Sequence, residues 1–230
     1  MTLWQVALLA PILVPQLVWV RIRAARLPEA AGARTGRAGS GPALRLLIVG
    51  DSSAAGVGVQ TQAQALSGRL FADLARDHAV DWQLVARSGA EVPDALEMLD
   101  HVEGRFDAAV ICLGVNDAKN GRRYADFERD YTALLQALSE RSGVTRVVCS
   151  GLPPMQFFPI LPRPLRDVLG ARAGRFDRAI AKMAKAHPGA RHLPMDFTDD
   201  VGLMASDGFH PGPKMYAMWA ERASAMLRGR

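Results

Sequence analysis

The chain of 230 residues is long enough for one α/β domain with a sizeable core and short for two. Its net charge of +5 is concentrated near the N-terminus, where five arginines and one glutamate precede residue 44 and leave only +1 for the rest. A nearly neutral domain lacks the basic surface that a nucleic acid requires, so we expect no nucleic-acid partner.

The first 20 residues, MTLWQVALLAPILVPQLVWV, carry no charged side chain, and RIRAAR follows directly. Twenty uncharged residues are just enough to span a bilayer, although Pro11 and Pro15 weaken that interpretation. A cleavable signal peptide has its positive charge before the apolar run. We therefore expect residues 1–26 to associate with a membrane, and the position of the arginines predicts a cytoplasmic domain. The alternatives are an N-terminally anchored periplasmic domain and an apolar helix that packs on the domain or lies on the membrane surface.

Residues 27–42, LPEAAGARTGRAGSGP, are rich in Gly, Ala and Pro and show no apolar periodicity. This composition is typical of a flexible linker. We therefore expect the folded domain to begin near Ala43 and to comprise residues 43–230.

Short apolar runs alternate with longer amphipathic stretches along this domain. The strand candidates are residues 44–50, 82–88, 108–114, 146–152 and 190–196. Near-continuous apolar character is typical of strands that are buried on both faces, and hence of a parallel sheet. Helical spacing of apolar residues is found in 66–74, 124–138, 176–184 and 215–226. The alternation predicts a three-layer α/β/α fold with a five-stranded, doubly wound parallel sheet.

The sequence contains no motif for a cofactor or a metal. Cys112 and Cys149 lie inside two of the apolar runs, so we expect buried core thiols rather than a disulfide or a metal site. The glycines Gly56 and Gly58 do not form a dinucleotide fingerprint, because the third glycine and the later acidic residue are missing. No lysine accompanies them as in a phosphate-binding loop.

Polar residues follow the predicted strands at the sheet edge where ligands bind in doubly wound folds. Ser52 follows the first strand, Gly89 the second and Asn116 the third, while Asp207 and His210 precede the last helix. A serine needs a base such as histidine to become a nucleophile, and a carboxylate orients the histidine. The backbone N–H groups of Ser52 and Gly89 and the amide of Asn116 are candidate donors to the oxyanion that acyl transfer generates.

These residues also carry a resemblance. GDSS at 50–53, Gly89 in ARSGAEV, GVND at 114–117 and DGFHP at 207–211 resemble, in the same order, the four conserved blocks of the SGNH, or GDSL-type, hydrolases. The resemblance covers about residues 44–227 and is strongest to the bacterial esterase, thioesterase and lysophospholipase branch. It implies a flavodoxin-like SGNH hydrolase fold, Ser52 as nucleophile, Asp207 and His210 as the rest of a triad, and an oxyanion hole formed by Ser52, Gly89 and Asn116. Ser53 stands where the family name has leucine.

The resemblance implies a metal-independent serine esterase that forms an acyl-enzyme intermediate. The apolar stretch at 153–165 is expected to line an acyl pocket or to pack under the last helix, which suggests short- to medium-chain esters, thioesters or lysophospholipids. Two other classes remain open: a metal-dependent phosphoesterase that uses Asp51, Asp117, Asp207 and His210 as ligands, and a catalytically idle domain that binds a lipid or a partner.

Overall fold

The computed structural model describes residues 3–23, 25–197 and 200–229. Its centre is a six-stranded sheet with the spatial order β1-β3-β2-β4-β5-β6. In chain order the strands are β1 (Thr35–Ala38), β2 (Ala43–Gly50), β3 (Ala79–Ala86), β4 (Ala108–Cys112), β5 (Arg146–Ser150) and β6 (Ala190–Leu193). The strands β2 to β6 are parallel to one another, as the sequence predicts, and each overlaps one of the five predicted runs.

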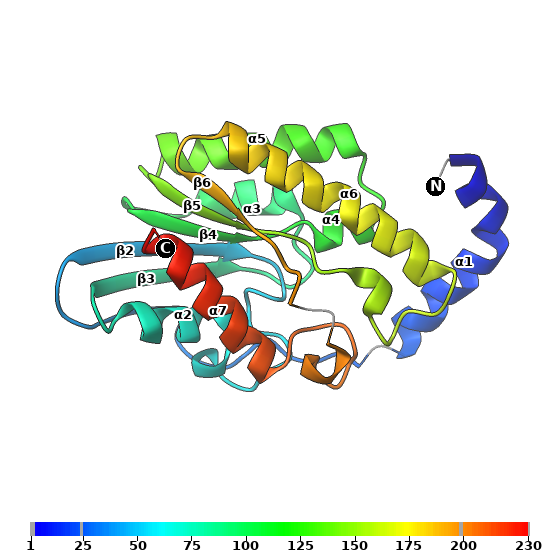
Figure 1. Cartoon of the computed structure of the whole chain (residues 1–230), viewed down its shortest axis with the longest axis horizontal. Helices are drawn as coiled ribbons and strands as arrows, with labels where there is room; N and C mark the ends of the chain where they lie inside the picture. Colours follow the sequence, from blue (N-terminus) through cyan, green and yellow to red (C-terminus); the bar gives the residue numbers. More distant parts are fainter. Residues whose placement is uncertain (1–2, 24, 198–199, 230) are drawn as a thin grey trace.

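Helices cover both faces of this sheet and complete the predicted three-layer fold (Figure 1). On one face lie α2 (Leu66–Leu74) and α7 (Pro213–Leu227), and on the other lie α3 (Val92–Leu99), α5 (Tyr124–Glu140) and α6 (Leu165–Ala186). Shorter elements lie in the loops: α4 (Val115–Lys119) and the single 3₁₀ turns η1 (Gln62–Gln64), η2 (Met155–Phe157) and η3 (Val201–Leu203).

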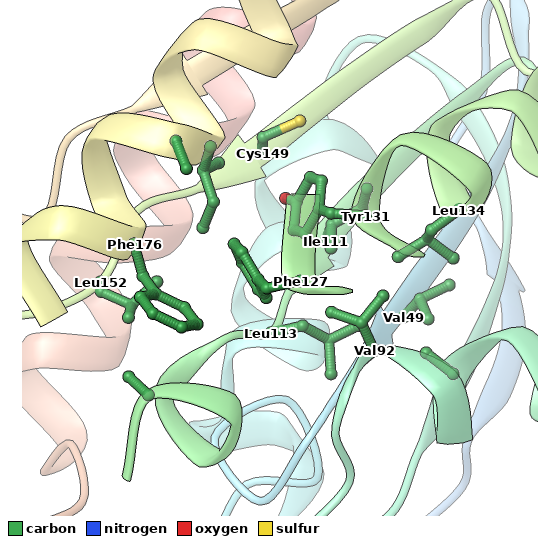
Figure 2. Close-up of a cluster of buried hydrophobic side chains, with 14 of the residues drawn as sticks. Val49, Val92, Ile111, Leu113, Phe127, Tyr131, Leu134, Cys149, Leu152 and Phe176 are labelled. Carbon is green, nitrogen blue, oxygen red and sulfur yellow. The ribbon is translucent and has the colours of Figure 1, made fainter. Parts of the chain in front are cut away.

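Each face of the sheet has its own hydrophobic core, because successive side chains of a strand point to opposite faces. In β2, Leu47 and Val49 belong to the core under α3, α5 and α6, while Leu46 and Ile48 belong to the core under α2 and α7. Figure 2 shows part of the first core, in which the rings of Phe127 and Phe176 lie 4.5 Å apart between the sheet and the helices. Burial of β2 on both sides explains its continuous apolar run.

The sixth strand corrects the interpretation of residues 27–42 as a flexible linker. Within them, β1 pairs antiparallel with β3, with Thr35 opposite Gln83 and Ala38 opposite Val80. Ala30 is buried in the core under α2 and α7. No apolar pattern marks this strand in the sequence, because β1 is a short edge strand whose residues are mostly exposed. The packed body of the domain therefore begins before Ala43.

The apolar N-terminal segment forms α1 (Leu3–Arg23), which lies against the start of α6 (Figure 1). One helical stripe faces the domain: Leu13 is buried, and Leu9 and Val20 pack against the core. Gln16 lies on the same stripe, donates to Arg163 O at 2.6 Å and accepts from Leu165 N at 3.1 Å. Among the residues described, no helix has the length and apolar character that crossing a bilayer requires.

Candidate active site

Ser52 lies at the carboxyl end of β2, in a tight turn that the sequence builds from small residues. A Cβ on Gly50 would lie 2.7 Å from Cys112 O of β4 and 2.5 Å from the Cβ of Ala54, so only glycine fits there. The turn continues with hydrogen bonds from Ala55 N to Asp51 O at 2.9 Å and from Val57 N to Ser52 O at 3.0 Å. Ser52 is thereby presented at the sheet edge where β2 has neighbours on both sides.

The buried carboxylate of Asp51 organises this turn. Its Oδ1 accepts hydrogen bonds from Ser53 N at 2.9 Å and from Ser53 Oγ at 2.7 Å. The hydroxyl of Ser53 is therefore used within the turn, whereas Ser52 Oγ lies beside His210. Burial raises the pKa of Asp51, although the two hydrogen bonds from Ser53 oppose that shift.

The three candidate triad residues come together in the structure. Ser52 Oγ lies 2.9 Å from His210 Nε2, and His210 Nδ1 lies 2.5 Å from Asp207 Oδ2. Asp207 is almost fully buried, and its Oδ1 accepts from the backbone N–H groups of Phe209 and His210, each at 3.0 Å. Burial raises the pKa of Asp207, but these hydrogen bonds and the His210 ring lower it by more, so the carboxylate form is favoured. An ionised Asp207 holds the His210 ring with Nε2 directed at Ser52.

The three candidate oxyanion donors differ in their present partners. Within the described chain, neither the Ser52 N–H nor the Gly89 N–H donates to a protein acceptor, so both are available to a ligand. The Asn116 amide lies at the start of α4 and is already engaged. Its Nδ2 donates to Ala90 O at 3.1 Å and to Asp51 Oδ2 at 3.3 Å.

The residues of the alternative metal site do not gather. Across the described ranges, no group of three or more His, Cys, Asp and Glu side chains is arranged to hold a metal ion. Asp117 is buried beside α3 and accepts from Val92 N at 3.3 Å. Burial, with a further contribution from the charge of Glu91, raises the pKa of Asp117 to about 7. Cys112 and Cys149 are free, buried thiols.

An apolar cavity adjoins Ser52 and His210. Its wall includes Leu113 from the loop after β4, Val115 from the start of α4, Met215 and Trp219 from α7, and Phe158 and Phe209 from other loops. Of the two roles considered for the stretch 153–165, lining a pocket and packing under the last helix, the structure agrees with the first alone. Pro153 and Phe158 line the cavity, whereas Met155, Leu161 and Leu165 join the core under α6 rather than packing under the last helix. The rings of Phe158 and Phe209 meet edge to face at 5.1 Å.

Two residues near the site could not be identified from the sequence. Glu29 accepts from both the N–H and the hydroxyl of Ser88, directly before Gly89, yet it lies in the supposed linker. Tyr216 of α7 donates its hydroxyl to the turn that carries Ser52, with acceptors Ser53 O at 2.9 Å and Val57 O at 2.7 Å. The sequence holds no signal for Glu29, and Tyr216 is hidden within an ordinary apolar helical stripe.

Comparison with known proteins places the chain in a family. A model described as the GDSL-like lipase/acylhydrolase family matches residues 48–218. A search among curated proteins gave no match. Among solved structures, the chain is similar to the psychrotrophic esterase EstA from Pseudoalteromonas sp. (18% identity, TM-score 0.61, covering 80% of this chain and 97% of that one). It is also similar to the lipase/acylhydrolase from Enterococcus faecalis (18%, 0.63, 81% and 96%) and to the acetylxylan esterase Axe2 from Geobacillus stearothermophilus (16%, 0.59, 82% and 94%).

At these identities the structural likeness establishes the fold, which is that of the SGNH hydrolases. The match to the family model extends over well more than half of the chain and includes Ser52, Gly89, Asn116, Asp207 and His210. The chain belongs to the GDSL-like lipase/acylhydrolase family and is a hydrolase that acts on ester bonds.

Proposed function

We propose that the protein is a serine esterase that works through an acyl-enzyme intermediate. The observation that carries the proposal is the hydrogen-bonded chain from Asp207 through His210 to Ser52, which ends at an apolar cavity. In the first step, His210 Nε2 takes the proton of Ser52 Oγ while that oxygen attacks the ester carbonyl. The tetrahedral intermediate collapses to the acyl-enzyme, and His210 donates the proton to the departing alcohol.

In the second step, a water molecule attacks the acyl-enzyme while His210 Nε2 takes its proton. The bond between the acyl carbon and Ser52 Oγ then breaks, the carboxylic acid leaves, and His210 returns the proton to Ser52 Oγ. The carboxylate of Asp207 stabilises the imidazolium that exists between these proton transfers. In both steps the negative carbonyl oxygen receives hydrogen bonds from the free N–H groups of Ser52 and Gly89. Asn116 contributes the third by turning one amide hydrogen from its present acceptor, Asp51 or Ala90 O, toward the oxyanion. None of these steps requires a metal.

The cavity favours substrates with an apolar acyl group. Its wall of methionine and aromatic side chains excludes water from the acyl chain and adapts to its shape. We therefore propose short- to medium-chain acyl esters as substrates, with fatty thioesters and lysophospholipids as the alternatives that share this acyl group.

Hydrolysis of p-nitrophenyl esters of increasing chain length, with and without EDTA, tests the proposal. We expect activity that peaks at short or medium chains and survives the chelator. Ser52→Ala should abolish turnover and labelling by a fluorophosphonate, whereas Ser53→Ala should keep most of both, because Ser53 Oγ only bonds Asp51. One similar structure is that of an esterase inhibited by monoethylphosphonate, which supports the choice of reagent. Activity that needs an added divalent cation, or labelling that persists in Ser52→Ala, would contradict the proposal.

We further propose that α1 attaches the enzyme to a membrane surface. Among the side chains described from Leu8 onward, one stripe of the helix packs on the domain, and seven large apolar side chains remain exposed: Leu8, Ile12, Val14, Leu17, Val18, Trp19 and Ile22. Arg21, Arg23 and Arg26 follow them and suit the negative charge of anionic lipids. A helix that lies in the interface plane buries such side chains among the lipid head groups without crossing the bilayer.

A further inference from the structure

The segment before β1 reaches the active-site edge of the sheet from outside the family match. Glu29 Oε1 accepts hydrogen bonds from Ser88 N at 2.8 Å and from Ser88 Oγ at 2.7 Å. The other carboxylate oxygen of Glu29 accepts from the guanidinium of Arg34, which also donates to Ala86 O at 2.7 Å. Arg34 is in turn fixed to β3, because its carbonyl oxygen accepts from Leu84 N at 2.7 Å. Glu29 is thereby anchored on one side and bound to the loop after β3 on the other.

That loop is a tight turn whose geometry decides where the Gly89 N–H points. Ala90 N donates to Arg87 O at 3.1 Å, Gly89 has a φ of 84°, and Ser88 does not have a positive φ, which together define a type II turn. Type I and type II turns differ by a flip of the central peptide, which here is the unit that joins Ser88 to Gly89. The Gly89 N–H belongs to this peptide. Because Glu29 binds the N–H and hydroxyl of Ser88, it holds the turn from behind and leaves the Gly89 N–H free.

We propose that Glu29 is a positioning residue for the oxyanion hole: anchored by Arg34, it holds the Arg87–Ala90 turn in the form that directs the Gly89 N–H at the reacting carbonyl. The inference rests on the proposed esterase function and assigns a role to a segment that lies before the matched region.

The neighbouring residues tie the same segment to the turn that carries the nucleophile. Ala30 N donates to Ala55 O at 3.2 Å, and Ala31 N donates to Gln60 O at 2.9 Å. Gln62 Nε2 completes the link with hydrogen bonds to Ala30 O and Ala55 O at 3.1 and 3.0 Å. The segment thus joins the two loops that supply backbone oxyanion donors, one with Ser52 and one with Gly89. A fixed spacing between those donors is what preorganised stabilisation of an oxyanion requires.

The ionisation of Glu29 is consistent with this role. Partial burial raises its pKa, but the two hydrogen bonds from Ser88 and the charge of Arg34 lower it by more. The carboxylate form, which accepts from both groups, therefore predominates at neutral pH.

The test compares Glu29→Ala with Arg37→Ala in the full-length protein, using p-nitrophenyl butyrate. Complete loss of one oxyanion donor costs about 10²–10³ in kcat, so a donor that is only misdirected should cost less. We expect Glu29→Ala to lower kcat by roughly ten- to a hundredfold with KM nearly unchanged, since the interaction acts on the transition state. Arg37 lies in β1, eight residues after Glu29, and pairs with Asp81, not with the Ser88 turn. Arg37→Ala should therefore leave kcat within about threefold of wild type.

A second variant separates positioning from a general loss of packing. Proline is favoured at the second position of a type II turn, and it needs neither the N–H nor the hydroxyl that Glu29 binds. Glu29→Ala combined with Ser88→Pro should recover most of the lost kcat. The inference is overturned if Glu29→Ala keeps kcat within threefold of wild type, if Arg37→Ala loses as much, or if the proline restores nothing.

If Glu29→Ala does not fold, Glu29→Gln takes its place in the test. The glutamine keeps one acceptor oxygen for Ser88 but turns an N–H donor toward Arg34, so the anchor is weakened. A kcat more than threefold below that of the wild type supports the inference, and a kcat equal to that of the wild type overturns it. A wild-type protein without esterase activity would instead overturn the proposed function itself.

Discussion

Replacing Asn116 by alanine removes an amide that lies between the expected oxyanion position and a buried carboxylate. The side chain is almost fully buried at the start of α4, and its Nδ2 bonds Ala90 O and Asp51 Oδ2. The substitution therefore has two consequences that can be measured separately. It removes one donor from the transition state, and it removes the hydrogen bonds to Asp51 Oδ2 and Ala90 O from the folded state.

The structure sets the size of both effects. Loss of an oxyanion donor typically lowers kcat by ~10²–10³, and KM should change little because the ground-state carbonyl carries less charge. Asp51 keeps its two bonds from Ser53 and loses the longer one, at 3.3 Å, from Asn116. The 3.3 Å bond to the Asp51 carboxyl contributes about 1–1.5 kcal/mol and the 3.1 Å bond to Ala90 O about 1 kcal/mol, so the folded state loses about 2–2.5 kcal/mol. For a domain of this size that corresponds to a fall in Tm of roughly 4–10 °C.

Steady-state kinetics with p-nitrophenyl butyrate and thermal unfolding followed by circular dichroism measure the two effects on one preparation. Asn120→Ala is the matched control, since Asn120 ends the same short helix but is exposed and bonds Glu91. It should change neither kcat nor Tm appreciably. If Asn116→Ala lowers Tm while kcat stays within threefold of wild type, Asn116 only supports the turn at Asp51. The backbone donors of Ser52 and Gly89 would then form the oxyanion hole alone.

Two further predictions follow from the N-terminal segment and from Asp117. A chain that starts at Leu27 keeps Glu29 and β1, so its kcat should stay within about threefold of wild type, but it should no longer bind phosphatidylglycerol vesicles. A chain that starts at Ala43 lacks Glu29 and β1 and should lose both kcat and thermal stability. If the full-length protein and the chain from Leu27 bind vesicles equally, α1 is not the membrane contact. Because the folded-state pKa of Asp117 is raised to about 7 from 3.8, its contribution to stability is fully present below pH 3.8 and is lost as pH rises toward 7. This shift in the pKa corresponds to a loss of folding free energy on the order of 4 kcal/mol. The Tm of Asp117→Asn should therefore vary less with pH between pH 4 and 8 than the Tm of the wild type. Parallel curves of Tm against pH for the two proteins would refute the raised pKa of Asp117.

The central strands could be predicted from the sequence because their burial on both faces leaves a continuous run of apolar residues. β2, β4 and β5 are covered by helices on both faces, so nearly every residue must be apolar, whatever its direction. β1 has no such run of apolar residues. Its four residues, TGRA, lie at the sheet edge with one partner strand, and what orders them is backbone pairing with β3, which leaves no trace in side-chain pattern.

Some residues of the candidate site can be predicted from the sequence and others cannot. Ser52, Gly89 and Asn116 are predicted to lie together because each follows a strand, and parallel strands end at one edge of the sheet. Asp207 and His210 are predicted as a pair because their spacing of three residues lets one loop carry both. Glu29 and Ser88 are 59 residues apart, and their contact depends on the path of β1 along β3. A glutamate among alanines and glycines has no pattern that predicts such a partner.

The distance between Ser52 and His210 is set by the docking of one helix. His210 lies just before α7, and Tyr216, the fourth residue of that helix, donates to Ser53 O and Val57 O of the turn that carries the nucleophile. A displacement of α7 along the sheet would therefore have to carry the serine turn with it or break both bonds. The buried ring of Tyr216 also resists such a displacement, because it is packed in the core under α7. The 2.9 Å contact between base and nucleophile thus depends on the packing of a hydrophobic core, although the two residues are 158 positions apart in the chain.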